Sequence, residues 1–252
     1  MKKVLTSLAL AVSALTLSAT TYAGVLRSTI DFETPIDGSP YLTFPAETGV
    51  LGSGDEFYQP GMSGRTLWVD AFSNSPLALP GRLVGSILSG ACADLLCPSN
   101  NSSSYVALLD DAVLAFGHAD GFTFSVRSLS ASFIGNGDPV SSLPGFLALQ
   151  GVRDGASLTA YYALTGLDAD GHLNFATIDT GAFGDYEFDY VYAYAYACTG
   201  TVSGSNCSAF STNEAQFALD DIVIEHVPEP ASLALVGLAG LALVGARRRR
   251  AV

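Results

Sequence analysis

The chain has 252 residues and a formal net charge of −13 at pH 7. Two terminal segments, residues 1–23 and 227–252, contain six of its 11 Lys and Arg residues. They contain only one of its 24 Asp and Glu residues. Residues 24–226 therefore keep 5 basic and 23 acidic residues, a net charge of about −18, and no lysine. Nucleic acid is not expected as a partner of so acidic a domain, and anionic lipid is a poor one. The acidity suits divalent cations, or simply keeps an exported protein in solution.

The first segment, residues 1–23, is typical of a secretory signal peptide. Two lysines precede an apolar stretch from Val4 to Leu17, and small residues then lead to Ala23. The stretch is short for a membrane-spanning helix, and Ala23 fits a cleavage site. We predict removal of this segment, which leaves residues 24–226 as one domain of ordinary size.

The last segment, residues 227–252, is typical of a membrane anchor. Its run Ala231–Ala246 carries no charge, and as a helix it would be roughly 24 Å long, slightly less than the ~30 Å hydrocarbon core. Four arginines follow, and moving one of them to mid-membrane costs about 2.5–3.5 kcal/mol. We therefore predict a single C-terminal transmembrane helix with the C-terminus in the cytoplasm.

The order of features from Val227 to Arg250 resembles the PEP-CTERM sorting signal of bacteria that produce exopolysaccharide. A Pro-Glu-Pro motif, an apolar helix and an arginine cluster follow one another. The resemblance implies that a membrane-embedded exosortase recognises the tail and cleaves it near the motif. It also implies an exported protein that is first membrane-anchored and then reaches the cell surface or the extracellular matrix of a biofilm. The sorting residues are Pro228, Glu229, Pro230, Arg247, Arg248, Arg249 and Arg250.

Short alternating segments between turn residues predict β-strands throughout residues 24–226. The region Thr34–Pro60 is rich in Gly and Pro and is predicted to be loop, and Ala112–Phe116 is interpreted as a short apolar run with the option of a helical turn. The segments with strand character are Ser28–Glu33, Arg65–Phe72, Leu77–Leu88, Tyr105–Leu109, Phe122–Phe133, Phe146–Val152, Ser157–Leu164, His172–Ile178, Asp185–Ala197 and Gln216–Glu225.

Three local signals refine this pattern. Asp154-Gly155 between two strands predicts a hairpin. The apolar positions shift by one residue between Val126 and Leu129, as at a β-bulge, and the last strand has a phase break at its Asp pair. No long amphipathic helix is visible in residues 24–226. The fold class is therefore predicted to be all-β, an antiparallel two-sheet β-sandwich.

The segments Asp31–Glu33 and Phe217–Ile222 resemble the ends of jelly-roll modules such as MAM domains and related carbohydrate-binding sandwiches. The resemblance implies a jelly-roll-like sandwich with its first and last strands side by side, and acidic residues there that bind a structural cation. Gln216, Phe217 and Asp220 also match the Gln-Phe-x-x-Asp pattern of a PEP-CTERM subfamily. MAM-type cysteine placement is missing, so only the architecture is carried over.

Adjacent terminal strands would bring Glu33 together with Asp220 and Asp221. Calcium takes six to eight oxygens, often from several carboxylates. A structural Ca²⁺ is therefore one hypothesis, and a solvated charge cluster at the strand ends is the other. The segment Asp168–Gly171 has the Asp-x-Asp-Gly order of a calcium loop but lacks the downstream glutamate, which favours a plain turn. No other cofactor is predicted.

The most regular alternation places Tyr190, Tyr192, Tyr194 and Tyr196 on one side of a strand, with Val and Ala on the other. Aromatic residues on one sheet face most often fill a sandwich core, and we expect core packing here. The alternative is an exposed aromatic face that stacks on glycan rings or meets another partner.

The four cysteines form two local pairs, Cys92 with Cys97 and Cys198 with Cys207. An even count in an exported protein predicts disulfides, and local pairing closes the smallest of the three possible sets of loops. Zinc is the alternative, but neither pair has Cys-x-x-Cys spacing or a neighbouring histidine.

Enzymatic activity is not predicted. The three histidines His118, His172 and His226 are scattered, and no nucleophile elbow, phosphate loop or dinucleotide fingerprint is present. Two functional hypotheses remain for an exported, non-enzymatic protein. One is a structural component of the surface or exopolysaccharide matrix. The other is a carbohydrate-binding, lectin-like module with or without calcium dependence.

Overall fold

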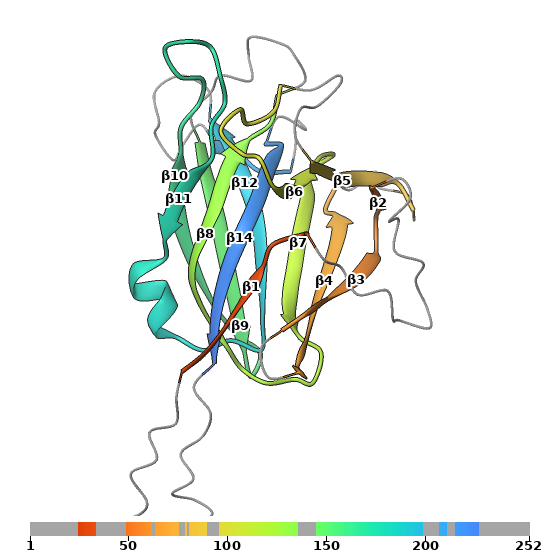
Figure 1. Cartoon of the computed structure of the whole chain (residues 1–252), viewed down its shortest axis with the longest axis vertical. Coiled ribbons are helices and arrows are strands. Elements are labelled where there is room, and N and C mark those ends of the chain that lie inside the picture. Colours follow the sequence, from red (N-terminus) through yellow and green to blue (C-terminus); the bar gives the residue numbers. More distant parts are fainter. Residues whose placement is uncertain are drawn as a thin grey trace, which may run out of the picture. The chain divides into compact units, whose positions relative to one another are not determined.

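The structure is a computed structural model that describes residues 25–33, 49–61, 64–75, 79, 81–89, 96–135, 145–198, 207–210 and 215–226. These residues build two antiparallel sheets of seven strands each. Residues 27–226 form one compact unit. The two sheets pack face to face as a β-sandwich, and the predicted all-β fold class is confirmed (Figure 1).

The first sheet has the strand order β11-β8-β14-β6-β5-β2, with β1 paired to β14 at its centre. The first and last strands therefore lie side by side, as the jelly-roll resemblance implied, and β1 begins where β14 ends (Figure 1). The strands are β1 (Leu26–Ile30), β2 (Val50–Gly52), β5 (Leu83–Ser89), β6 (Ser104–Leu108), β8 (Ser125–Phe133), β11 (Ala176–Asp179) and β14 (Phe217–His226).

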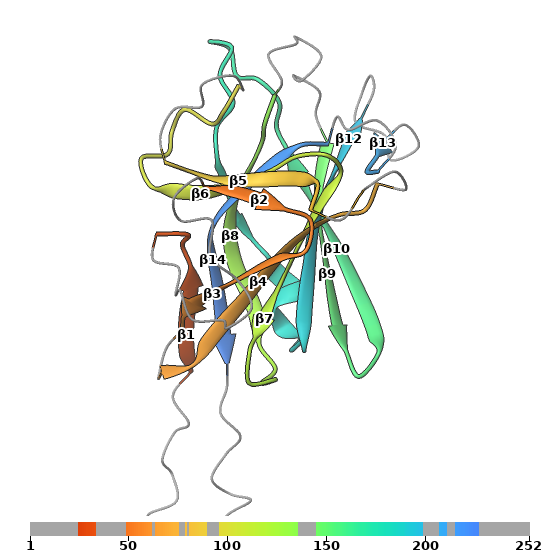
Figure 2. The ribbon, with the colours of Figure 1, turned by 90° about the vertical axis from the view of Figure 1, so that its right-hand side faces the viewer.

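The second sheet has the strand order β10-β9-β12-β7-β4-β3, with β13 paired to the end of β12. Figure 2 shows its long strands β4, β7, β9 and β10 in the other layer of the sandwich. The strands are β3 (Asp55–Pro60), β4 (Thr66–Ser73), β7 (Ala112–His118), β9 (Gly145–Arg153), β10 (Ala156–Leu164), β12 (Tyr190–Cys198) and β13 (Cys207–Ser208). The short 3-10 helix η3 (Gly181–Asp185) precedes β12.

The core lies between the sheets and is filled by large side chains from both. Phe116 from the second sheet and Phe133 and Phe217 from the first are almost fully buried and belong to one apolar cluster. Close packing of such rings leaves little volume for the inward side of β12, which is made of Val191 and alanines.

Several local predictions are confirmed. Asp154 and Gly155 both have positive φ, 50° and 78°, in the two-residue turn between β9 and β10, as a hairpin of this length requires. The ladder between β8 and β14 shifts register between Asp220 and Val223 and again between Val223 and Ile224. Both phase breaks seen in the sequence therefore lie at one irregularity in the sheet.

Two predictions are wrong. The run Ala112–Phe116 is not a helical turn but most of strand β7, because this strand lies inside the second sheet with every residue buried. The region Thr34–Pro60 is not all loop, since it contains β2 and β3. The two strands pair in different sheets, β2 with β5 and β3 with β4, and a short connection at Ser53-Gly54 joins them.

The predicted signal peptide at 1–23 and transmembrane helix at 231–246 lie outside the described residues. Within the part of the chain that the structure describes, no helix is long and apolar enough to cross a membrane.

Candidate functional site

The tyrosines of β12 face outward, and the expectation that they pack in the core is wrong. Tyr190, Tyr192, Tyr194 and Tyr196 are half-buried on the outer side of the second sheet, whereas Val191 and the intervening alanines are buried. A buried tyrosine needs a hydrogen-bond partner for its hydroxyl. The outward arrangement leaves all four hydroxyls on the surface side and gives the interior to small apolar side chains.

The change of side occurs at a bend between Phe188 and Tyr190. Phe188 is buried and stacks on Phe183 of η3, with ring centroids 4.6 Å apart. Because Phe188 points inward and Tyr190 outward, the sequence alternation from Tyr186 to Tyr196 does not correspond to one continuous face. The face begins at Tyr190.

Neighbouring strands extend the tyrosines into a wider aromatic surface. Directly paired residues of an antiparallel sheet lie on the same face, so the ladders place Trp68 in the row of Tyr190, and Gln150 in the row of Tyr192. We call this outer surface of the second sheet the tyrosine face. Its members are Tyr190, Tyr192, Tyr194 and Tyr196 of β12, Trp68, Asp70 and Phe72 of β4, Gln150 of β9 and Tyr161 of β10.

The strand β7, between β4 and β12, contributes only small residues near the centre of this face, Ala115 and Gly117. A Cβ on Gly117 would lie 3.0 Å from Nε1 and 3.1 Å from Cε2 of Trp68. The indole of Trp68 therefore lies directly against the backbone of β7. Glycine at this position is what allows the ring to lie so close.

The rings on the face contact one another edge to face or at a tilt. Tyr190 and Tyr192 have centroids 5.2 Å apart, Phe72 and Tyr192 6.1 Å, and Tyr161 and Tyr196 6.0 Å. Side-chain hydrogen bonds join Tyr194 to Tyr196 and Tyr196 to Tyr161. Burial, followed by the neighbouring Tyr196, raises the pKa of Tyr194 to about 12. At neutral pH the face therefore presents aromatic rings edged with uncharged hydroxyl groups.

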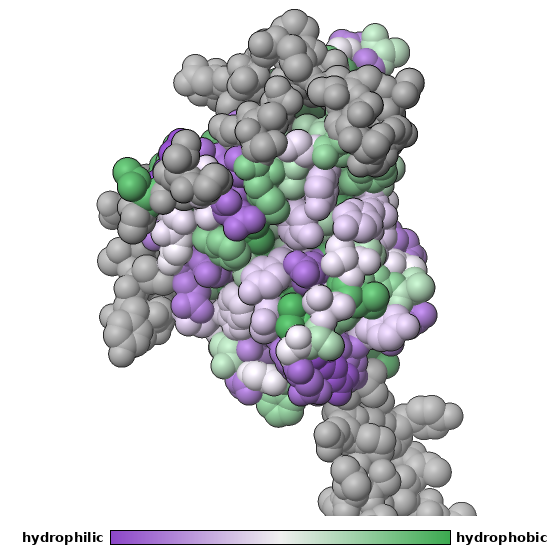
Figure 3. All heavy atoms as spheres, turned by 180° about the vertical axis from the view of Figure 1, so that it is seen from behind, coloured by the Kyte–Doolittle hydropathy of each residue, from purple (hydrophilic) through white to green (hydrophobic). Residues whose placement is uncertain are grey.

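A hollow of about 280 Å³ opens in the middle of the face. Phe72, Val113, Gln150, Tyr192 and Tyr194 are among its lining residues, together with Phe210 just beyond β13. Figure 3, seen from behind, shows pale and green residues over much of this side, with single purple residues among them. Its lining combines aromatic rings with two amides, Gln150 and Asn74.

Two carboxylates border the aromatic rows. Asp70 and Glu56 are directly opposite each other in the β3–β4 ladder. Two like charges in such a pair destabilise the sheet. Burial, followed by repulsion from Glu56 and Asp55, raises the pKa of Asp70 to about 6. No donor among the described residues hydrogen-bonds the buried Oδ1 atom of Asp70. The ionised carboxylate of Asp70 therefore lowers the stability of the folded state.

The structure brings Glu33 and Asp220, predicted calcium ligands, to neighbouring residues at and just before the start of β6. Glu33 accepts hydrogen bonds from Ser104, and Asp220 accepts from Ser103 Oγ at 2.9 Å and from Asn101 Nδ2 at 2.8 Å. Burial raises the pKa of Asp220 despite these donors. The described residues hold no group of three or more His, Cys, Asp or Glu placed to bind a metal ion.

Asp221, the third predicted ligand, has a φ of 49° and is exposed, because the irregularity in β14 turns it away from the buried Asp220. The calcium site therefore stays a prediction. In the turn Asp168–Gly171, Asp168 accepts hydrogen bonds from the backbone of Asp170 and His172 and from Asn174, the pattern of a side-chain-capped turn.

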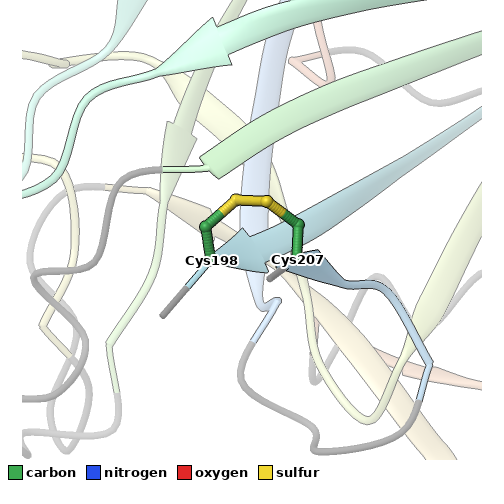
Figure 4. The surroundings of a disulfide bond; sticks show 2 residues. All are labelled: Cys198 and Cys207. Carbon is green, nitrogen blue, oxygen red and sulfur yellow. A yellow bond between two sulfur atoms is a disulfide. The ribbon is translucent and has the colours of Figure 1, made fainter. Parts of the chain in front are cut away.

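The predicted disulfide between Cys198 and Cys207 is confirmed (Figure 4). It joins the last residue of β12 to β13, and three residues further on Phe210 lies 5.3 Å from Tyr194, centroid to centroid. Cys97 is also disulfide-bonded, but Cys92 lies outside the described residues. The disulfide thus lies at the end of the strand that carries the tyrosines, and close in sequence to Phe210, whose ring contacts Tyr194.

The sorting residues 228–230 and 247–250 lie outside the described residues, but a comparison of the sequence bears on them. The chain matches the PEP-CTERM protein-sorting motif over residues 226–250. This match indicates an exported protein that is targeted for processing by an exosortase. Neither the curated proteins nor the solved structures contain a significant match to the chain.

The part of the tyrosine face that comes from β4 was not predicted from the sequence. Trp68, Asp70 and Phe72 alternate with Leu67, Val69 and Ala71, which are fully buried. The three outward residues are the larger or more polar set, so the same period of two could have identified this surface. Gln150 and Phe210 carry no comparable signal, because strand pairing places Gln150 there and a ring contact with Tyr194 places Phe210 there.

Proposed function

We propose that this protein is an exported, non-enzymatic component of the cell surface or the exopolysaccharide matrix, and that its tyrosine face binds polysaccharide. The observation that carries the proposal is the outward orientation of the tyrosine row. Aromatic rings stack on the apolar faces of sugar rings, and the hydroxyls of Tyr and the amide of Gln150 can exchange hydrogen bonds with sugar hydroxyls.

The dimensions of the row suit a chain of sugars rather than a single one. Tyr190 to Tyr196 covers six residue steps of about 3.3 Å, roughly 20 Å in all. Successive rings are then about 7 Å apart along one line. The row is carried by a central strand of the sheet, so that its rings are positioned by a rigid scaffold rather than by loops.

Export of the protein also supports polysaccharide as the ligand of the tyrosine face. The sorting motif indicates an exported protein, and polysaccharide is an abundant polymer outside a cell that produces exopolysaccharide. An exposed aromatic surface of this size would be a liability without a partner, and a matrix polymer is a partner that such a location supplies.

The proposal is tested by titrating the full-length chain with soluble oligosaccharides and following the fluorescence of Trp68, the only tryptophan. Replacing Tyr192 and Tyr194 with Ala should weaken binding at least tenfold, about 1.4 kcal/mol, without loss of the far-UV circular dichroism of the sandwich. The matched control is Tyr186→Ala, because Tyr186 is exposed but lies outside the face. Absence of binding to any oligosaccharide would overturn the proposal.

A further inference from the structure

The charges at the tyrosine face distinguish between classes of polysaccharide. The only ionisable carboxylates on its rows are Glu56 and Asp70 among the described residues, and they lie side by side. Asp70 is two residues from Phe72 and shares a cross-strand row with Tyr192, with only Ala115 between them. Adjacent strands are about 4.8 Å apart, so two strand spacings separate Asp70 on β4 from Tyr192 on β12. The carboxylate therefore lies beside the row of tyrosine rings.

These two carboxylates receive no compensating cation from the domain itself. Residues 24–226 contain no lysine and five arginines, all within the described residues. Each arginine forms an ion pair with a carboxylate other than Glu56 and Asp70. Asp70 and Glu56 therefore repel each other across the ladder, and the domain carries about −18 overall. An anionic polysaccharide would add to this repulsion.

We propose, on the basis of the polysaccharide-binding function proposed above, that the ligand is a cationic polysaccharide with free amino groups. Its ammonium groups bind Asp70 and Glu56 while neighbouring sugar rings stack on the tyrosine face. The charge of the partner complements the one pair of carboxylates on the face. Aromatic faces also attract ammonium groups directly, which adds to the binding of the same polymer.

Asp70 is then a specificity residue and not a structural one. A carboxylate that is half-buried, faces a second carboxylate and keeps an oxygen without a protein donor costs stability in the free protein. An ammonium group supplies both the missing charge and the missing donors. A neutral polymer would supply donors only, and would leave the repulsion between Asp70 and Glu56 in place.

The test uses the full-length chain in a polyoxyethylene detergent, which contains no sugar. Three 1,4-linked hexasaccharides serve as probes: β-linked glucosamine, its N-acetylated form and α-linked galacturonic acid. Affinities are measured by Trp68 fluorescence and by calorimetry at low salt and near neutral pH, where Asp70, whose pKa is about 6, is mostly ionised. We expect the glucosamine hexamer to bind at least tenfold more tightly than the N-acetylated hexamer, and the galacturonic acid hexamer to bind weakest. High salt, which shortens the Debye length to about 3 Å at 1 M, should reduce this preference.

The variant Asp70→Asn should lower the ratio of the glucosamine affinity to the N-acetylated affinity about tenfold. The matched control Asp170→Asn removes the same charge from an exposed turn outside the face and should leave the ratio unchanged. Tyr192→Ala should weaken both hexamers. An equal fall of the ratio in both Asn variants would mean general charge attraction and would overturn the role of Asp70.

The remaining outcomes separate this inference from the proposed function. Equal binding of the glucosamine and N-acetylated hexamers overturns the cationic ligand but leaves polysaccharide binding intact. Binding of none of the three overturns the cationic ligand, and absence of binding to every oligosaccharide in the wider titration overturns both. A sedimentation experiment completes the test: if the protein is a dimer that Tyr192→Ala dissociates, the face is an interface between two copies of the chain and the inference is wrong.

Discussion

The ring of Phe188 lies against Gly151 so closely that a Cβ there would come within 2.3–2.5 Å of three ring carbons. This contact determines where, just before β12, the aromatic side chains stop pointing into the core and begin to point outward. Phe188 fills the space beside Gly151, and the chain bends so that Tyr190 emerges on the opposite side. The orientation of the tyrosine row thus depends on a glycine in the neighbouring strand.

Replacing Gly151 with Ala should destabilise the sandwich by about 1–3 kcal/mol, because the added methyl overpacks the core against Phe188. The measurement is the free energy of unfolding from urea titration, with Trp68 as the probe. The double variant Gly151→Ala with Phe188→Leu tests the cause, since a smaller side chain should recover part of the loss, so that the two effects are not additive. Additive losses would contradict the proposed contact.

The sequence predicted strands more reliably than it predicted which side of a strand is buried. The alternation Tyr190–Tyr196 requires a strand, but it is compatible with either orientation, since Tyr and Ala both occur in cores. The choice depends on volumes supplied by other strands, here Phe116, Phe133 and Phe217, and no local pattern contains that information. The expectation of core packing followed the usual preference of aromatic residues and failed for this reason.

The same distinction between local signals and contacts with distant strands explains which other features could be predicted from the sequence. The hairpin at Asp154-Gly155 was predictable because its turn chemistry is local. The strands β2 and β3 were missed because glycine and proline around them weaken the local signal. The pairing of Asp70 with Glu56 could not be predicted, because β3 and β4 had first to be recognised as neighbours in the correct register.

Removing the disulfide by Cys198→Ala with Cys207→Ala should cost about 2.5–3 kcal/mol of unfolding free energy. The bond closes a loop with a sequence separation of 9, and chain-entropy estimates for loops of this size give that magnitude. The variant should also bind oligosaccharide more weakly, because Phe210 is no longer held against Tyr194. Chemical denaturation and the Trp68 titration measure the two effects. An unfolding free energy within about 0.5 kcal/mol of the wild type would contradict the prediction.

Glu225 of β14 is joined to β1 through Arg27 and to β8 through Arg127, and its replacement should make the sandwich less stable at neutral pH. Arg27 and Arg127 both donate hydrogen bonds to its carboxylate. Glu225→Gln should cost about 1–2 kcal/mol, because hydrogen bonds between charged groups are lost. The matched control is Asp185→Asn, since Asp185 is exposed and 3.6 Å from Arg127, and it should cost less than about 0.5 kcal/mol.

The same contact predicts a pH dependence. Burial acts to raise the pKa of Glu225, but the hydrogen bonds from Arg27 and Arg127 together lower it below its usual value of 4.5. The folded state therefore holds the proton less tightly than the unfolded state, and the stabilisation is complete above pH 4.5 and is lost as the pH falls through the lowered pKa. Between pH 5 and pH 3 the wild type should lose stability more steeply than Glu225→Gln, measured by thermal unfolding. Parallel curves would rule out this contribution.

Asp70 should show the opposite sign. Its pKa is raised from 3.8 to about 6 by burial and by repulsion from Glu56 and Asp55. The folded state therefore binds the proton more tightly than the unfolded state, so the contribution of Asp70 to stability is complete below pH 3.8 and is lost as the pH rises through about 6. Asp70→Asn should thus stabilise the free protein at pH 7.5 by about 1–2 kcal/mol, since solvent screening of the half-buried carboxylate reduces the value that about two pK units at 1.36 kcal/mol each would give. It should leave stability almost unchanged near pH 4.

Unfolding free energies of the two proteins from pH 4 to pH 8 give the difference directly, because the titration of all other groups cancels. A difference that does not grow as the pH rises would mean that the Asp70 carboxylate is already compensated in the free protein, and the case for a cationic ligand would lose its main electrostatic support.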